Sequence, residues 1–503
     1  SMLLLISSVK SCLDFLGPMC KNASQPSQFS CNIVNHLEKD EIMVQIHSET
    51  SLAKIKTAFV WELGSDEPQS PANSLSSANE KVVQLKTKLQ NVNVKLFNES
   101  SSKNISLQLL INLQAPQQCV VVRQSKTKYK IGFVVSLFSN GGVSRVNQQL
   151  GEMLLGDGHE VVMITGPQSV NDFKLAKGFQ RLALNSFSSQ LTQMTDILNL
   201  KLDVIVFQEY WLAENYNFIE KFVETGVKVI AFHHTVYIWH HVYSPGSRSG
   251  NQSTMQVVKR MHESYPRAHA VVNLSPFDAL IFKQIGCKSR FIPNPSLVEV
   301  EMNFQPKPEQ QILWVGRMAL EKQPEQALKM MQSLYQVNQK AKLIMIGDPE
   351  RDIQGKIVAQ GLKNVEAVGY KSNVFDYLQN ASVLTLTSSF EGWGMVITEA
   401  IAHGVPVVAY DLPYLVLMKC GVVRVPKKDP TKMAEEVNKL LQNETLRLET
   451  VAEGQKCIQE LNDMILPRWN DLLDKVMNDE VIDYEDDADE KWVEQVLYNE
   501  TKI

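Results

Sequence analysis

The chain has 503 residues, more than one ordinary hydrophobic core accommodates, so we expect two or three domains. A hydrophobic content of 44% and a charged content of 21% are typical of a globular protein. The formal net charge of −5 argues against a protein that binds nucleic acid.

The seven cysteines fit neither a disulfide framework nor the spacing of zinc ligands. We therefore interpret them as mostly free thiols in a reducing compartment, which predicts a cytoplasmic location. The apolar run of residues 2–6 is far shorter than the roughly 20 residues that cross a bilayer. A peripheral position at a membrane face stays open.

Alternation of apolar and polar residues marks the first part of the chain, for example over residues 42–46 and 105–113. Several alternating segments without an intervening helix predict a small all-β region, which we place at residues 1–125. Two interpretations of this region are open: a module that binds an acceptor, and a packing or oligomerisation domain.

A different pattern follows. The apolar strand of residues 129–135 leads to Gly141-Gly142 and a predicted helix, and another apolar strand comes next. This order predicts a parallel sheet with helices on both faces, an N-terminal Rossmann-like domain at residues 126–295. A glycine-rich loop that opens a helix can bind an anion through its free N–H groups.

Histidines end a later strand of this domain. The apolar residues 227–232 are followed by His233 and His234. Ligands gather at the carboxyl ends of parallel strands, where a histidine can donate a hydrogen bond to a sugar hydroxyl or a phosphate.

A second Rossmann-like domain is predicted at residues 296–465, followed by a return helix and an acidic tail at residues 466–503. Its first strand ends in Gly-Arg, and Arg317 is followed five residues later by Lys322. Two cations at a strand end suit a diphosphate, because arginine binds as a fork and lysine as a point charge.

The most informative stretch connects an apolar strand, residues 383–386, to a helix. Glu391 lies in the connecting loop and Glu399 lies about one turn inside the helix. Gly392 and Gly394 allow positive φ and let the backbone approach a ligand closely. Free N–H groups at the start of a helix favour an anion, so the stretch describes a site for a sugar joined to a diphosphate.

This stretch, Glu391-Gly-Trp-Gly-Met-Val-Ile-Thr-Glu399, resembles the E-x7-E motif of retaining glycosyltransferases of family 4. Trp393 stands where the family usually has Phe. The glycine-rich loop, the strand-end histidine and the Gly-Arg…Lys pair occur in the family's order, so the resemblance covers residues 129–477. It implies the α/β GT-B fold, with two Rossmann-like domains facing a cleft, here preceded by a small all-β domain.

The resemblance also implies roles. Glu391 would hold sugar hydroxyls near the anomeric carbon, Glu399 would bind the ribose, and His234 would contact the sugar, with His233 as the alternative. The candidate catalytic residues are Glu391, His234, Arg317 and Lys322. The candidate donor-binding residues are Gly141 and Gly142 at the diphosphate, Gly369 and Tyr370 at the base, and Gly392, Trp393, Gly394, Met395, Val396 and Glu399.

We therefore predict a retaining hexosyltransferase that needs neither a metal nor another cofactor. It would move a hexose or N-acetylhexosamine from a nucleotide diphosphate sugar, UDP- in preference to GDP-, to a hydroxyl of a glycan, protein or lipid acceptor. The alternative is a non-catalytic nucleotide-sugar-binding scaffold or a pseudoenzyme partner of another transferase. An epimerase, or a phosphorylase with a pyridoxal lysine, is a further alternative on the same fold.

Overall fold

The computed structural model divides the chain into two compact units, residues 1–128 and residues 129–503. In the first unit it describes Lys128 and the eight strands between Phe29 and Ser125. In the second unit it describes residues 129–501 except 136–137, 139–140, 170–171, 173–174, 176, 185–193, 209–212, 243–253, 297–309, 349–352, 483 and 485–487.

The described part of the first unit consists of antiparallel strands, which agrees with its predicted all-β character. Two four-stranded sheets have the orders β1-β2-β5-β4 and β3-β6-β7-β8. The strands are β1 (Phe29–His36), β2 (Ile42–Ser48), β3 (Ile55–Glu62), β4 (Leu75–Ala78), β5 (Val82–Thr87), β6 (Asn91–Asn98), β7 (Ile105–Asn112) and β8 (Gln118–Ser125).

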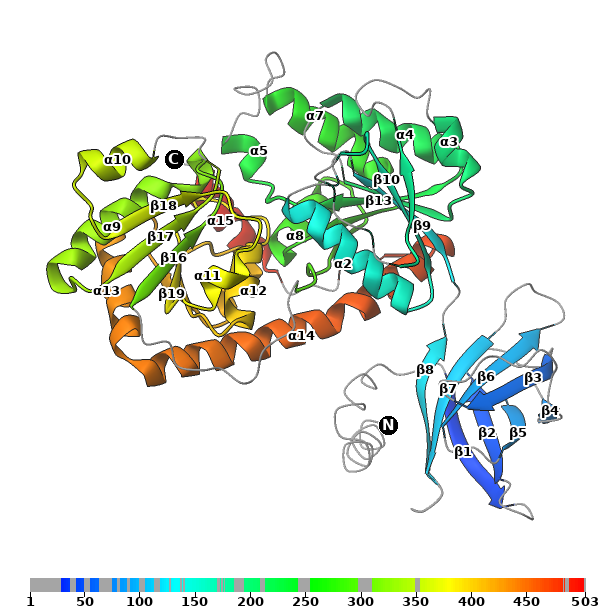
Figure 1. The fold of residues 1–503 in the computed structure, drawn as a ribbon. Helices are drawn as coiled ribbons and strands as arrows, with labels where there is room; N and C mark the ends of the chain where they lie inside the picture. The colour runs from blue at the N-terminus through cyan, green and yellow to red at the C-terminus, as the bar shows by residue number, and fades with distance from the viewer. Residues whose placement is uncertain are drawn as a thin grey trace. The chain divides into compact units, whose positions relative to one another are not determined.

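The second unit begins with a seven-stranded parallel sheet of order β11-β10-β9-β12-β13-β14-β15 (Figure 1). Its strands are β9 (Lys130–Val135), β10 (Glu160–Thr165), β11 (Gln180–Ala183), β12 (Val204–Phe207), β13 (Lys228–His233), β14 (Ala270–Asn273) and β15 (Ser289–Phe291). Its helices are α2 (Gly142–Gly156), α3 (Met194–Asn199), α4 (Asn217–Glu224), α5 (Trp239–Val242), α7 (Thr254–Ser264) and α8 (Pro276–Gln284), with short turns η3 (Ala213–Tyr216) and η4 (Tyr265–Arg267).

A second parallel sheet has six strands in the order β18-β17-β16-β19-β20-β21. These are β16 (Gln311–Val315), β17 (Lys342–Ile346), β18 (Val365–Gly369), β19 (Val383–Leu386), β20 (Val407–Tyr410) and β21 (Val422–Val425). Its helices are α9 (Pro324–Val337), α10 (Ile353–Ala359), α11 (Phe375–Leu378), α12 (Met395–Ala402) and α13 (Pro430–Gln442), with turns η5 (Leu320–Lys322) and η6 (Val416–Lys419).

In both parallel sheets the order in which strands are added reverses at the first strand, since β9 lies between β10 and β12, and β16 lies between β17 and β19. Ligands bind outside the carboxyl ends of the strands at such a point. The central strands β12 and β19 are buried throughout, as expected for a sheet covered by helices on both faces. The two sheets are therefore two Rossmann-like domains.

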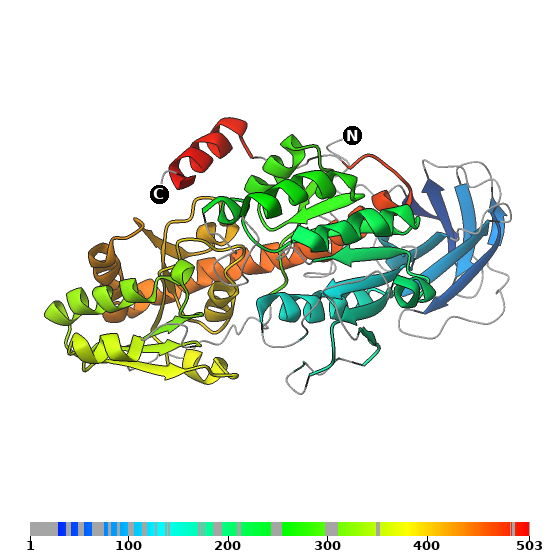
Figure 2. The same ribbon diagram turned by 90° about the horizontal axis from the view of Figure 1, so that it is seen from above.

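One long helix ties these domains together. α14 (Glu444–Met477) contacts α12 and α13 in the second domain and continues to the first (Figures 1 and 2). There Tyr129 Oη donates to Asp474 at 2.8 Å, and Trp469 meets Phe232 edge-on. The predicted return segment thus lies within a helix that begins at Glu444, and the last helix, α15 (Glu490–Thr501), packs on α8.

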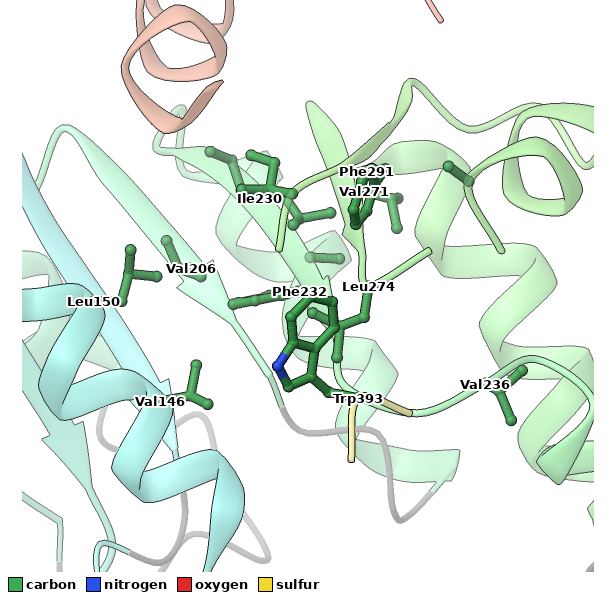
Figure 3. Packing of buried hydrophobic residues seen from close by; sticks show 14 of the residues in the cluster. Val146, Leu150, Val206, Ile230, Phe232, Val236, Val271, Leu274, Phe291 and Trp393 are labelled. Carbon is green, nitrogen blue, oxygen red and sulfur yellow. The ribbon is translucent and has the colours of Figure 1, made fainter. Parts of the chain in front are cut away.

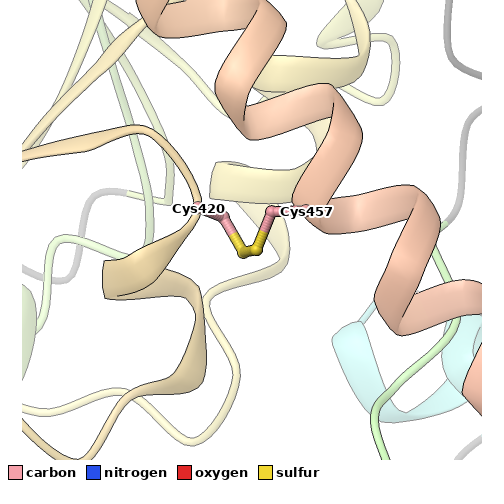
Figure 4. The surroundings of a disulfide bond; sticks show 2 residues. All are labelled: Cys420 and Cys457. Atoms are coloured by element: carbon pink, nitrogen blue, oxygen red, sulfur yellow. A yellow bond between two sulfur atoms is a disulfide. The ribbon is translucent and has the colours of Figure 1, made fainter.

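A disulfide joins Cys420, at the end of η6, to Cys457 in α14 (Figure 4). The expectation of free thiols is wrong for this pair, because the fold brings together two cysteines whose spacing in sequence carries no signal. Cys287 is a buried free thiol. Within the described ranges, no helix combines the length and the apolar composition needed to cross a bilayer.

Candidate functional site

Each of the two glycine-rich loops leads into a helix, and the N-termini of these helices, α2 and α12, meet. A Cβ on Gly142, the first residue of α2, would lie 2.9 Å from Sδ of Met395, the first residue of α12. The residues before them, Gly141 and Gly394, provide no side-chain cap. Both helix starts therefore offer unsatisfied N–H groups and positive dipole ends to one anion.

The loop of the predicted motif touches the first domain directly. A Cβ on Gly392 would lie 2.2 Å from the carbonyl oxygen of His234, so only glycine permits this approach. Trp393 is buried in the same apolar cluster as Phe232 and Leu274 of the first domain (Figure 3). Trp393, which stands where the motif it resembles usually has Phe, thus belongs to the contact between the domains.

Glu391 and Lys322 form an ion pair. Lys322 Nζ lies 2.6 Å from Glu391 Oε1, and the hydroxyl of Ser388 donates to the same oxygen at 2.7 Å. The Glu391 side chain keeps only 8% exposure. These two bonds fix the position of the carboxylate. The ammonium group of Lys322 is a positive charge of the kind that stabilises a diphosphate.

Neighbouring strand ends hold this lysine in place. β16 pairs with β19, so the turns that follow them lie side by side. Trp314 Nε1 donates to Thr387 Oγ1 at 2.9 Å, and the Thr387 hydroxyl donates to the carbonyl of Lys322 at 2.8 Å. Ser389 N donates to the carbonyl of Glu321 at 2.7 Å. The loop after β19 therefore positions η5 and its lysine.

Three further predicted residues, Arg317, Gly369 and Tyr370, make hydrogen bonds away from the Lys322–Glu391 pair or are partly exposed. Arg317, with a side chain 52% exposed, pairs with Glu321 at 2.6 Å and not with Glu391. Gly369 has φ +73°. Its carbonyl accepts a hydrogen bond from the backbone N–H of Gly347, the residue that follows β17, at 3.1 Å. Tyr370 is 44% exposed.

A cavity of about 500 Å³ lies between α2 of the first domain and α12 of the second. Gly369 and Tyr370 do not line it, although the turn that follows them does. Its lining consists of Arg145, Gln148, Gln149 and Glu152 on α2, the segment Ser372 to Phe375, Leu378, and Glu399 and His403 on or beside α12.

Glu399, which lines the cavity, pairs with a residue that the sequence did not single out. Arg145 Nη1 lies 3.1 Å from Glu399 Oε1 and links α2 to α12. Burial raises the pKa of Glu399, and Arg145 opposes this shift. Arg145 lies three residues after Gly142, so a cation in the first turn of the predicted helix was the signal available in the sequence.

The two strand-end histidines have different surroundings. His233 is fully buried among aromatic rings and its Nδ1 lies 3.2 Å from the hydroxyl of Tyr265; burial, followed by His240 and His234, holds its pKa well below the usual value. His234 contacts the Gly392 loop through its backbone carbonyl and keeps 9% exposure. Burial lowers the pKa of His234 to about 3, so its ring is neutral.

His234 belongs to a buried polar chain. Its Nε2 lies 2.5 Å from Gln208 Oε1, and Gln208 Nε2 donates to Asn147 Oδ1 at 2.6 Å. Gln208 directly follows β12. A polar residue directly after a predicted strand is the signal in the sequence that points to Gln208.

Among the described residues, no group of three or more His, Cys, Asp or Glu side chains could hold a metal ion. The prediction that no metal is needed assumed that the chain has no Asp-x-Asp triplet, and this assumption is wrong, because Asp487-Ala-Asp489 is such a triplet. Asp487 lies outside the described residues. Metal independence therefore rests on the family resemblance alone and stays an expectation.

Comparison with known proteins places this geometry in context. Residues 299–457 match the family model for glycosyl transferases group 1. The amylovoran biosynthesis glycosyltransferase AmsD of Erwinia amylovora is 28% identical over 196 residues. That match covers 38% of this chain and 55% of the relative, so it spans about half the relative's length.

Solved structures share the fold. A sucrose-phosphate synthase from Thermosynechococcus elongatus superposes with a TM-score of 0.58 at 18% identity, covering 70% of this chain and 100% of that one. HepE of Anabaena in complex with UDP gives 0.51 at 14% identity, covering 68% and 100%. The predicted α/β fold, with two Rossmann-like domains arranged as in GT-B glycosyltransferases, is confirmed.

Proposed function

We propose that this protein is a retaining glycosyltransferase of family 4. It transfers a hexose or N-acetylhexosamine from a nucleotide diphosphate sugar, UDP- in preference to GDP-, to a hydroxyl of a glycan, protein or lipid acceptor. The family match of residues 299–457 and the GT-B fold support a transferase that uses a nucleotide sugar.

One observation carries the proposal. The uncapped N-termini of α2 and α12 meet beside the Lys322–Glu391 pair, with Glu399 on the same helix. Negative charge grows on the leaving diphosphate during transfer, and preorganised N–H groups and a lysine stabilise such charge. In this proposal Glu391 accepts hydrogen bonds from sugar hydroxyls, and Glu399 accepts them from the ribose.

The first test is thermal unfolding against UDP-, GDP- and ADP-sugars, measured in EDTA and again with added Mg²⁺ or Mn²⁺. A ligand at 100 times its dissociation constant adds about 2.7 kcal/mol to stability, which is a readable shift. A shift with UDP-glucose or UDP-N-acetylglucosamine but not with the GDP- and ADP-sugars supports the proposed donor. A shift that needs a divalent cation contradicts metal independence.

The second test measures turnover and stereochemistry. Donor hydrolysis or transfer to an acceptor pool is followed by NMR, and the anomeric configuration of the product is compared with that of the donor. Glu391→Gln should abolish turnover while Glu224→Gln, exposed at the end of α4, should not. Binding without turnover under all conditions favours the non-catalytic scaffold, and an inverted product rejects the retaining mechanism.

A further inference from the structure

The buried hydrogen-bond chain of Asn147, Gln208 and His234 determines which nitrogen of the His234 ring carries the proton. Asn147 is fully buried and Gln208 keeps 2% exposure, so water does not compete for their hydrogen bonds. Gln208 Nε2 donates to Asn147 Oδ1. This bond leaves Gln208 Oε1 directed toward His234 Nε2. A carbonyl oxygen only accepts, so the proton of a neutral His234 lies on Nε2.

The other ring nitrogen of His234 then has a defined role. Nδ1 has no hydrogen-bond partner among the described residues and is not one of the fully enclosed side-chain atoms. In a neutral ring protonated at Nε2, Nδ1 carries a lone pair and accepts a hydrogen bond. The ring lies against Phe232, with 3.9 Å between ring centroids, which restricts its orientation.

We propose that Gln208 is a positioning residue that holds the proton of His234 on Nε2, so that Nδ1 accepts a hydrogen bond from a hydroxyl of the donor sugar. This inference rests on the proposed function and reverses the expected direction of the bond, in which histidine was the donor. A lone pair repels a phosphate oxygen and attracts a hydroxyl proton, so His234 contacts the sugar and not the diphosphate.

The titratable groups around His234 agree with a neutral ring. His233, the neighbour on the same strand, is itself buried and has a lowered pKa. From the second domain, the loop that meets His234 at Gly392 carries Glu391, whose charge is balanced by Lys322. Burial is the cause of the lowered pKa of His234.

The direct test is 15N NMR of the 503-residue chain labelled at histidine. Long-range couplings identify the protonated nitrogen, and the His234 signal is assigned by its loss in His234→Gln. We expect Nε2–H and an unprotonated Nδ1 from pH 5.5 to pH 8. A proton on Nδ1, as rotation of both amides would produce, overturns the proposal.

The functional test compares UDP with UDP-glucose and UDP-N-acetylglucosamine. Gln208→Met keeps the side-chain length but removes the acceptor that holds Nε2–H. It should weaken binding of the UDP-sugar roughly 2- to 10-fold, the effect of one lost hydrogen bond, and leave UDP binding unchanged. Equal weakening of UDP and UDP-sugars indicates a merely structural effect and overturns the proposal.

A charge variant gives the third readout. Gln208→Glu places a carboxylate beside Nε2, which favours the imidazolium and raises the pKa of His234 toward its ordinary value of about 6.5. Turnover should then fall roughly tenfold between pH 8 and pH 5.5, because protonated Nδ1 cannot accept. Gln332→Glu, on the exposed face of α9, is the matched control.

The outcomes separate this inference from the function on which it rests. A wild-type protein that neither binds nor turns over nucleotide sugars rejects the proposed function. An active protein whose His234 carries its proton on Nδ1, or whose Gln208→Glu variant gains activity at pH 5.5, rejects the inference alone.

Discussion

The guanidinium of Arg145 lies 3.1 Å from the carboxylate of Glu399 and joins the first helix of one Rossmann-like domain to the motif helix of the other. A ribose that binds Glu399 has to share this carboxylate with Arg145. The Glu399 side chain is 13% exposed and that of Arg145 is 35% exposed, so the carboxylate bears most of the desolvation.

Glu399→Gln should therefore stabilise the protein while it weakens nucleotide binding. Burial raises the pKa of Glu399 in the folded state. A carboxyl group with a raised folded-state pKa makes the folded state less stable as pH rises through that pKa. The gain in Tm should be larger at pH 8 than at pH 5.

Thermal unfolding at several pH values, and calorimetry with UDP, measure the two effects. Glu152→Gln, which changes the same charge on the wall of the same cavity, should alter neither. A lower Tm for Glu399→Gln at pH 8 would show that the bond to Arg145 outweighs the desolvation of the carboxylate.

Loss of the Lys322 side chain, which pairs with Glu391, should lower the rate of sugar transfer. Lys322→Ala removes the cation 2.6 Å from Glu391 Oε1. Removal of one preorganised group that stabilises developing charge costs roughly 10²- to 10³-fold in kcat. Steady-state turnover of the UDP-sugar measures the effect, and Lys329→Ala on the exposed side of α9 is the control. A loss confined to KM would mean that Lys322 binds the ground state and transition state equally.

Gly392 makes a prediction about the contact between the domains. Gly392→Ala places a Cβ at 2.2 Å from the carbonyl of His234, so the loop has to retreat. A displacement of about 1 Å at a reacting centre costs on the order of 100-fold in rate.

The control for Gly392→Ala is Gly156→Ala. Gly156 ends α2, and a Cβ there meets nothing within 4 Å. This substitution should leave turnover unchanged and not reduce stability, because alanine favours a helix over glycine. Small-angle scattering with and without UDP would show whether Gly392→Ala opens the domains, and wild-type turnover by this variant would contradict the close approach.

Local sequence pattern was sufficient for the sheets and for the two strand–loop–helix units, because each depends on short apolar runs and on nearby glycines. The motif order then placed Glu391 and Lys322 in separate elements that the fold brings together. The pattern could not show that Arg145 reaches Glu399, since that pair depends on how two domains close.

The same limit applies to the buried residues around His234. The sequence indicated a strand-end histidine, and the partner Gln208 comes from a neighbouring strand, 26 residues earlier. Only the parallel pairing of β12 with β13 brings these strand ends together. Arg317 shows the opposite case, in which a residue matches the motif while its side chain is half exposed and bonded to Glu321.

The disulfide gives the last prediction. Cys420 and Cys457 are separated by 37 residues and connect η6 to the long helix α14. A Cβ on Gly421 would lie 2.3 Å from the carbonyl of Thr450, so these segments already pack closely around the bond. Closing such a loop restricts the unfolded chain and stabilises a protein by about 2–4 kcal/mol.

A reductant should therefore lower the Tm of the wild-type protein, and Cys457→Ala should show the lowered Tm with or without the reductant. Burial raises the pKa of Cys287 to about 12, so this thiol reacts poorly and Cys287→Ala should keep the full response to reductant. Mass spectrometry of the alkylated protein counts the thiols in each state. A wild-type Tm that does not change with reductant would mean that packing alone holds α14 against η6, and that the link contributes no stability.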